Sequence, residues 1–307
     1  MRSLLALAAA LPLAAQIPPD VDFHLRLAND KTRFQLGETI PLHLSFSSAT
    51  PEKYELVMWM HDPEDFQVEP AEGASDPLPD PFAGGRGTGP GGTAVLREKP
   101  EIIGRDLNEW VRFDSPGQYR ITGVSRRVQP RRRPEEPPTR ALELRSNTVE
   151  VTILPADPVW QAAELVRAIE VLETVLPGPD WKTFEVRRSA ARKMRFLNTP
   201  GAVRQCVRRF RGVEPLDSEF RFCLLGASPR QLAVETMEQG LRDSSQPVST
   251  GFIDTLAKLR AWLELGAPGP YPKAEPAQTR WRDESKKTVR ARDEAAGGRY
   301  RPARRGD

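Results

Sequence analysis

The residues best suited to chemistry in this sequence of 307 amino acids are five arginines that lie close together. Guanidinium groups form paired hydrogen bonds with phosphates and carboxylates. The cluster therefore predicts a surface for an anionic polysaccharide, a lipid head group or an acidic protein. Prolines surround it, which favours the exposed tip of a long hairpin, and the alternative is a loop that only keeps the protein soluble. The candidate binding residues are Arg126, Arg127, Arg131, Arg132 and Arg133.

The two cysteines, Cys206 and Cys223, both lie in the C-terminal half among apolar residues at helical spacing. In an oxidising compartment they could form one disulfide. Buried cysteines at such spacing are also common as free thiols, and the sequence leaves both alternatives open. Two cysteines and three scattered histidines cannot make a conventional structural zinc site.

Signatures of catalysis are missing from the sequence. It has no HExxH motif, no G-x-S-x-G motif, no phosphate-binding loop and no dinucleotide glycine fingerprint. His24, His43 and His61 fall in or at the ends of expected strands, where a lone histidine is more often a surface or satisfied residue than a ligand. We therefore expect no catalysis, no cofactor and no metal. The net charge of +3 is small for this length and gives no reason to expect nucleic acid as a partner.

Residues 1–15 have the order of a secretory signal peptide, with a positive start, an apolar run from Leu4 to Leu13 and small residues before the expected cleavage after Ala15. The run is shorter than the roughly 20 apolar residues of a membrane span, and no cysteine follows it to mark a lipoprotein. The alternative is a frayed helix on a cytoplasmic protein. We expect a periplasmic or secreted protein without a membrane span.

Residues 20–154 show the two-residue alternation of half-buried strands. The clearest examples are Val21 to Leu27, Ile40 to Phe46 and Tyr54 to Met60, and strand character returns at Glu109 to Phe113. The stretch 62–92 is acidic and rich in proline and glycine, so we expect a flexible loop there. Its carboxylates suit calcium but have no recognised loop spacing.

The period changes at Asp157-Pro158, where a capping oxygen and a proline are typical of a helix start. Apolar residues then recur every three or four positions, and we expect five helices in an antiparallel array over residues 157–266. Residues 272–307 hold eleven basic and six acidic side chains and few aliphatic ones. We therefore expect a basic, disordered tail over residues 267–307, with a transient helix over 278–296 as the alternative.

Three motifs in order resemble bacterial immunoglobulin-like (Ig-like) domains over about 130 residues. They are Phe34-x-x-Gly37-Glu38-x-Ile40-x-Leu42, Asp114-x-Pro116-Gly117-x-Tyr119-x-Ile121 and Ser146-Asn147-x-Val149-x-Val151-x-Ile153. The resemblance implies a β-sandwich over residues 20–154. It also implies a tyrosine corner, in which the Tyr119 hydroxyl bonds to nearby backbone, and the alternative is that Tyr119 is simply a large core residue.

The stretches Ala190 to Val203 and Ser228 to Leu241 resemble the helix–turn–helix units of HEAT-like repeats, over about 80 residues and with uneven spacing. Together the two resemblances imply a multidomain β + α protein with an N-terminal Ig-like β-sandwich and a C-terminal HEAT-like array. Both families present surfaces to other macromolecules. We therefore expect an exported, non-catalytic protein–protein interaction module of the cell envelope, bound to another envelope or secreted protein. The alternatives are a secreted peptidase inhibitor, a ligand- or polysaccharide-binding sandwich and, more remotely, an enzyme fragment.

Overall fold

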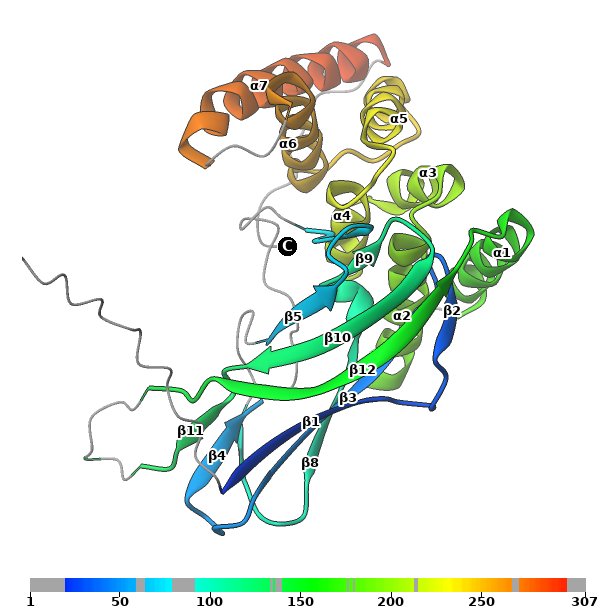
Figure 1. Cartoon of the computed structure of the whole chain (residues 1–307). Helices are drawn as coiled ribbons and strands as arrows, with labels where there is room; N and C mark the ends of the chain where they lie inside the picture. Colours follow the sequence, from blue (N-terminus) through cyan, green and yellow to red (C-terminus); the bar gives the residue numbers. More distant parts are fainter. Residues whose placement is uncertain are drawn as a thin grey trace, which may run out of the picture.

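The computed structural model describes residues 20–58, 64–78, 92–132, 135, 140–175, 177–178, 180–212, 215–266 and 271–296. Among these residues, β-strands occupy the N-terminal part and helices the C-terminal part, so the expected mixed β and α fold is confirmed (Figure 1). The expected signal peptide, residues 1–15, lies outside the described residues.

The first sheet has three antiparallel strands, in the order β1 (Val21–Leu27), β3 (Pro41–Ser48) and β8 (Glu101–Asp106). Every second residue of β1 and β3 is more deeply buried than its neighbours, which is the alternation that the sequence predicts. Phe23 and Phe46 stack on the core side, with their ring centroids 4.6 Å apart. β8 is an edge strand, and no described strand pairs with its outer side.

The second sheet contains β2 (Arg33–Gln35), β12 (Leu144–Leu154), β10 (Gly117–Ser125) and β5 (Glu64–Glu69), in that order. β2 runs parallel to β12, and the other neighbours are antiparallel. Buried side chains of both sheets belong to one apolar core. The N-terminal part is therefore held together by contacts between strands that are far apart in sequence.

Part of the stretch 62–92 forms strands, which corrects the expectation of a flexible loop there. β5 pairs with β10 along its whole length, and β6 (Ala74–Ser75) pairs with β9 (Arg112–Phe113). The composition concealed β5 because one of its two buried positions is an acidic residue, Glu64.

The remaining strands form a small sheet in the order β11 (Val128–Pro130), β4 (Tyr54–Val57) and β7 (Thr93–Val95). Between β8 and β9 the chain makes a 3-10 helix, Leu107–Glu109, so the expected strand does not begin at Glu109. The Asn108 side chain fixes this turn, because its oxygen accepts the Ile40 N–H at 2.7 Å. This contact joins residues 68 positions apart, so a local pattern does not reveal it.

Two side-chain contacts stabilise the arrangement of strands. Asn147 of β12 bridges to β1, where it accepts the Leu25 N–H at 2.8 Å and donates to the Leu25 carbonyl oxygen at 3.0 Å. The Tyr119 hydroxyl lies 2.9 Å from the carbonyl oxygen of Ser115, the kind of backbone contact that the Ig-like resemblance implies. Burial, with a smaller contribution from the charge of Asp114, raises the pKa of Tyr119.

Seven helices follow among the described residues, namely α1 (Pro158–Thr174), α2 (Trp181–Leu197), α3 (Pro200–Arg209), α4 (Asp217–Leu225), α5 (Arg230–Arg242), α6 (Thr250–Leu265) and α7 (Tyr271–Ala295). Side-chain oxygens of Asp157, Asp180, Thr199 and Ser249 accept backbone N–H groups at the starts of α1, α2, α3 and α6. The five expected helices correspond to α1, α2, α3, α5 and α6, whereas α4 and α7 were not expected as stable helices.

Helix α7 corrects the expectation of a disordered tail for residues 271–295. It packs against α6 and α5 (Figure 1). Its buried face consists mainly of small or polar residues at helical spacing, namely Ala274, Gln278, Ser285 and Val289. Ion pairs tie the helix to α6, including Arg282 Nε to Asp254 at 2.6 Å. The many charged residues of this segment therefore lie on the outer side of a packed helix.

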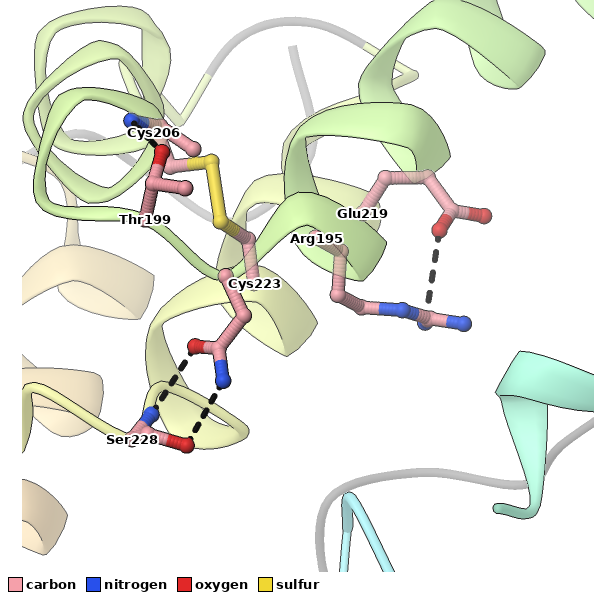
Figure 2. The surroundings of a disulfide bond; sticks show 8 residues. Arg195, Thr199, Cys206, Glu219, Cys223 and Ser228 are labelled. Atoms are coloured by element: carbon pink, nitrogen blue, oxygen red, sulfur yellow. Dashed lines mark hydrogen bonds and ion pairs between the residues drawn. A yellow bond between two sulfur atoms is a disulfide. The ribbon is translucent and has the colours of Figure 1, made fainter. Parts of the chain in front are cut away.

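A disulfide joins Cys206 of α3 to Cys223 of α4, two residues separated by 17 positions in the sequence (Figure 2). Both cysteines are buried in the helical core. Nearby, the Asn198 side chain at the end of α2 makes two hydrogen bonds with Ser228, at 2.6 and 2.9 Å. These contacts fasten α2, α3 and α4 to one another.

Replacement of both Cys206 and Cys223 by alanine is expected to lower the free energy of unfolding by about 3 kcal/mol. A cross-link that closes a loop of this size restricts the unfolded chain by about that amount. Urea denaturation of the oxidised wild type and the double variant measures the difference. Reduction of the wild-type protein serves as a control that leaves the sequence unchanged, and equal midpoints before and after reduction would contradict the prediction.

Candidate functional site

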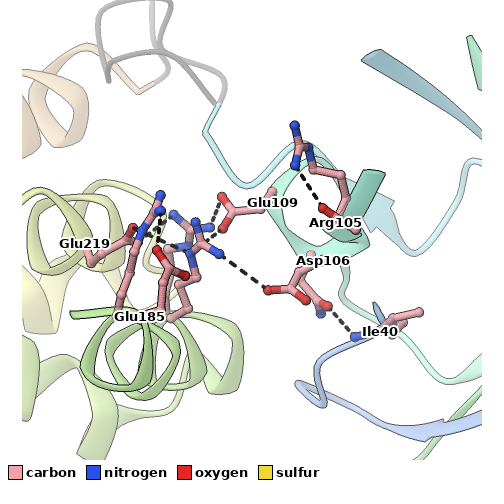
Figure 3. Close-up of polar contacts among 11 residues, drawn as sticks. Ile40, Arg105, Asp106, Glu109, Glu185 and Glu219 are labelled. Atoms are coloured by element: carbon pink, nitrogen blue, oxygen red, sulfur yellow. Dashed lines mark hydrogen bonds and ion pairs between the residues drawn. The ribbon is translucent and has the colours of Figure 1, made fainter. Parts of the chain in front are cut away.

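A cluster of buried charges joins the β-rich part to the helices. Arg188, Arg192 and Arg195 come from one face of α2, since residues three and four positions apart in a helix are neighbours. They meet Glu109 of the 3-10 helix and Glu219 of α4 (Figure 3). Arg188 Nε lies 2.8 Å from Glu219 Oε1, and Arg192 Nε lies 3.2 Å from Glu109 Oε1. We call these five residues the junction cluster.

The junction cluster is held by electrostatics at low solvent exposure. The Arg195 side chain is 4% exposed and pairs with both glutamates. Burial alone would raise the pKa of Glu109, but Arg195 and Arg192 outweigh it and lower that pKa. Some of these atoms, including Arg192 Nε and Glu219 Oε2, lie within ion-pair distance without hydrogen-bond alignment. The cluster therefore works mainly through charge pairing rather than through directed hydrogen bonds.

A cleft of about 360 Å³ opens beside the junction cluster, between the end of the first sheet and α2. Arg105, Asp106 and Trp110 line it on the β side. Trp181 and Glu185 line it on α2, and Trp181, at its rim, is 62% exposed. The cleft thus combines aromatic surface with charges of both signs, as sites that bind polypeptide commonly do. We call it the junction cleft.

Besides Glu109 and Arg192, whose buried atoms pair by charge, three residues in the wall of the junction cleft carry buried polar atoms that lack a hydrogen-bond partner among the described residues. They are His43 Nδ1, Arg105 Nε and Trp110 Nε1. Buried polar groups are nearly always paired in folded proteins. The presence of several such atoms in one wall indicates that the wall is suited to contact a ligand in addition to packing within the protein. Burial raises the pKa of Asp106 in the same wall, although the charge of Arg192 opposes this effect.

The edge strand β8 runs into the junction cleft. The Leu107 N–H donates to the Ile40 carbonyl, so the backbone groups of Leu107 point toward the β3 side. In an antiparallel pair, successive residues point their N–H and C=O groups alternately toward and away from the partner strand. The backbone groups of Ile102, Gly104 and Asp106 therefore point away from β3. Ile102 is 49% exposed, and a Cβ atom added at Gly104 would meet nothing within 4 Å. The Gly104 carbonyl accepts from Arg105 Nη1 at 2.9 Å. Among the described residues, the outward N–H groups of β8 are therefore left for strand pairing beside the cleft, whereas the Gly104 carbonyl is already used by Arg105.

The structure does not bring the five predicted arginines together on one surface. Arg127 is fully buried and paired with Glu64, so its expected place on a binding surface is wrong. The other described members of the cluster are exposed: Arg126 pairs with Glu143, Arg131 with Glu52, and Arg132 lies at the surface. Arg133 lies outside the described residues. Partner carboxylates of Glu52, Glu64 and Glu143, whose proximity a linear pattern does not reveal, balance the charge of Arg131, Arg127 and Arg126.

Sequence reasoning missed the junction cluster. A detectable signal was present in α2, where three arginines recur at one helical face. Nothing in the sequence shows that this face is covered by Glu109 and Glu219, which lie far away along the chain.

The described residues hold no group of three or more His, Cys, Asp or Glu side chains that could bind a metal ion. Of the predicted histidines, His24 is exposed beside Asp22, His43 lies in the cleft wall, and His61 is outside the described residues. Among the described helices, none combines the length and hydrophobicity needed to cross a bilayer. No protein-family model matches the chain, and a search of curated proteins finds no match either.

Proposed function

We propose that the protein is an exported, non-catalytic interaction module that binds an extended segment of another protein along β8 and in the junction cleft. The observation that carries this proposal is the outer side of β8, which no strand of the described chain covers and which leads directly into the cleft. An extended peptide can add to such an edge as a further strand. Backbone pairing would give affinity, and the cleft would select side chains.

The architecture that we propose around this site is an Ig-like β-sandwich joined to a HEAT-like helical array. The single core shared by two sheets and the Tyr119 contact support the first assignment. The contacts between successive helices from α1 to α4 support the second. The junction cluster favours a fixed placement of the β-rich part relative to the helices. This would hold β8 and α2 in constant positions on the two sides of a ligand. Export to the periplasm or outside the cell rests on the apolar run near the N-terminus.

The partner chemistry follows from the cleft. A peptide on β8 would meet the Trp181 indole at the rim and the guanidinium groups of Arg105 and Arg188 inside. Aromatic and arginine side chains are enriched where interfaces gain most of their affinity. We therefore expect the bound segment to carry an apolar side chain for Trp181 and a carboxylate for Arg105.

The variant Gly104→Pro tests this proposal. Proline removes an N–H that points away from β3 and blocks a strand from approaching, while edge strands tolerate proline. Gly104→Ala is the matched control, since its Cβ meets open space and its N–H is kept. Envelope proteins of the source cell are captured on mature protein starting at Gln16. A partner should bind wild type and Gly104→Ala, with at least about tenfold weaker binding to Gly104→Pro.

Thermal unfolding of the two variants must first match, so that loss of binding reports on the edge and not on the fold. A partner that binds Gly104→Pro as tightly as Gly104→Ala would overturn the assignment of β8 as the contact. Failure to capture any protein with the wild type would count against an interaction module as a whole.

A further inference from the structure

A second cleft, of about 200 Å³, lies at the carboxyl ends of α1 and α3 and shares no lining residue with the junction cleft. Among the described residues, four arginines and one glutamate, Glu173, are the charged side chains that line it. We call this cleft the arginine pocket, after the four arginines in its wall, Arg187, Arg208, Arg209 and Arg211. Like charges gathered in so small a space repel one another unless an anion lies between them.

Two of the four arginines are held in place by the protein. Arg187 is 7% exposed and donates through Nη1 to the carbonyl oxygens of Leu172 and Val175 at the end of α1. Arg209 pairs with Glu173 at 2.8 Å and with Gln205 one turn earlier in α3. These two residues form the fixed floor of the cleft, and Arg209 already pairs with Glu173, the carboxylate that the described part of the wall contains.

The other two arginines, Arg208 and Arg211, are exposed. In the part of the chain that the structure describes, the side chains of Arg208 and Arg211 make no hydrogen bond or ion pair with a protein group. The pKa of Arg209 is lowered by burial and further by the nearby charges of Arg208 and Arg211, against the opposing effect of Glu173. The three guanidinium groups are therefore close enough to repel one another.

The dipole of α3 explains only part of this arrangement. Partial negative charge at a helix C-terminus favours a cation in the last turn, and Arg208 and Arg209 stand there. Arg211 lies beyond the helix end, and Arg187 belongs to α2. Residues from two helices and a loop therefore converge on one pocket.

We propose that the arginine pocket binds a phosphate group, carried by a free phosphate or by a lipid head group. Guanidinium groups match the geometry of phosphate oxygens and bind them through paired hydrogen bonds. Arg208 and Arg211 supply the free donors, and Arg187 and Arg209 give the pocket its fixed positive field. This site is independent of the strand-pairing site on β8.

The double variant Arg208→Gln/Arg211→Gln tests the proposal, with inorganic phosphate titrated calorimetrically into the full-length mature protein at low salt. Neither side chain has a partner among the described residues, so the fold should be unchanged in thermal unfolding. We expect phosphate to bind the wild type and the affinity to fall by about tenfold or more in the variant. Arg126→Gln/Arg131→Gln removes two charges elsewhere and should keep the wild-type affinity.

Sedimentation with phosphatidylcholine vesicles, with and without phosphatidylglycerol, distinguishes the two sources of the phosphate. Binding to the anionic vesicles that disappears in Arg208→Gln/Arg211→Gln would identify a lipid head group. Binding of inorganic phosphate alone would identify a free phosphate. No binding of phosphate by the wild type, or equal affinity in the wild type and Arg208→Gln/Arg211→Gln, would overturn the proposal.

Discussion

Replacement of Arg127 by methionine is expected to lower the free energy of unfolding by about 3–5 kcal/mol. The Arg127 side chain is fully buried and donates to both carboxylate oxygens of Glu64. Its Nη1 also donates to the carbonyl oxygens of Val57 and Met58, each at 2.9 Å. Methionine keeps much of the volume but leaves a buried carboxylate without its partner. Urea denaturation followed by far-UV circular dichroism measures the loss.

Arg126→Met is the matched control, because Arg126 is exposed and its pair with Glu143 is solvated. We expect it to change stability by less than about 1 kcal/mol. The double variant Arg127→Met/Glu64→Leu should recover part of the loss, since it removes the unpaired charge. Similar costs for Arg126→Met and Arg127→Met would show that burial of this ion pair does not set the stability.

The variant Glu219→Gln is expected to cost about 3 kcal/mol and to weaken the connection between the β-rich part and the helices. Glu219 is 3% exposed and lies within ion-pair distance of Arg188, Arg192 and Arg195. Loss of its charge leaves these arginines buried with too few carboxylates, and breaking a buried pair in this way costs several kcal/mol. Tryptophan fluorescence during urea denaturation reports on the junction.

Glu185→Gln is the comparison for this prediction, since it makes the same chemical change at the rim of the junction cleft. Glu185 is 35% exposed and pairs with Arg188 alone among the described residues, at 3.2 Å. A change of less than about 1 kcal/mol is expected there. If both glutamine variants unfold at the same urea concentration as the wild type, the junction cluster does not hold the two parts together.

The order of strands and helices could be predicted because local patterns determine it. The alternation from Val21 to Leu27 and the capping residues Asp157 and Thr199 mark elements whose signals lie within a few residues. Helix α7 was missed because Gln278 and Ser285 occupy its buried face, where aliphatic residues are usual. Its stability comes from contacts with α6, which no local pattern contains.

The candidate sites were harder to predict, because they depend on which charges meet in space. Arg126 and Arg127 are adjacent and chemically identical in the sequence, yet one is exposed and the other is fully buried. β8 was missed because Gly104 and the charged residues around it give little strand signal, although that composition suits an open edge. The arginine pocket joins Arg187 to residues of another helix and therefore has no linear motif.

The Asn147 bridge has a consequence for self-association. A sheet whose two edge strands are both unpaired can add further copies of the protein at each edge, which leads to fibrils. Here β12 lies along β1, and Asn147 occupies the backbone groups of Leu25, which leaves β8 as the accessible edge of the first sheet among the described strands. Two copies that met through β8 would close each other's free edge, and growth would stop at a dimer. The fold can therefore display a reactive edge without the hazard of polymerising through it.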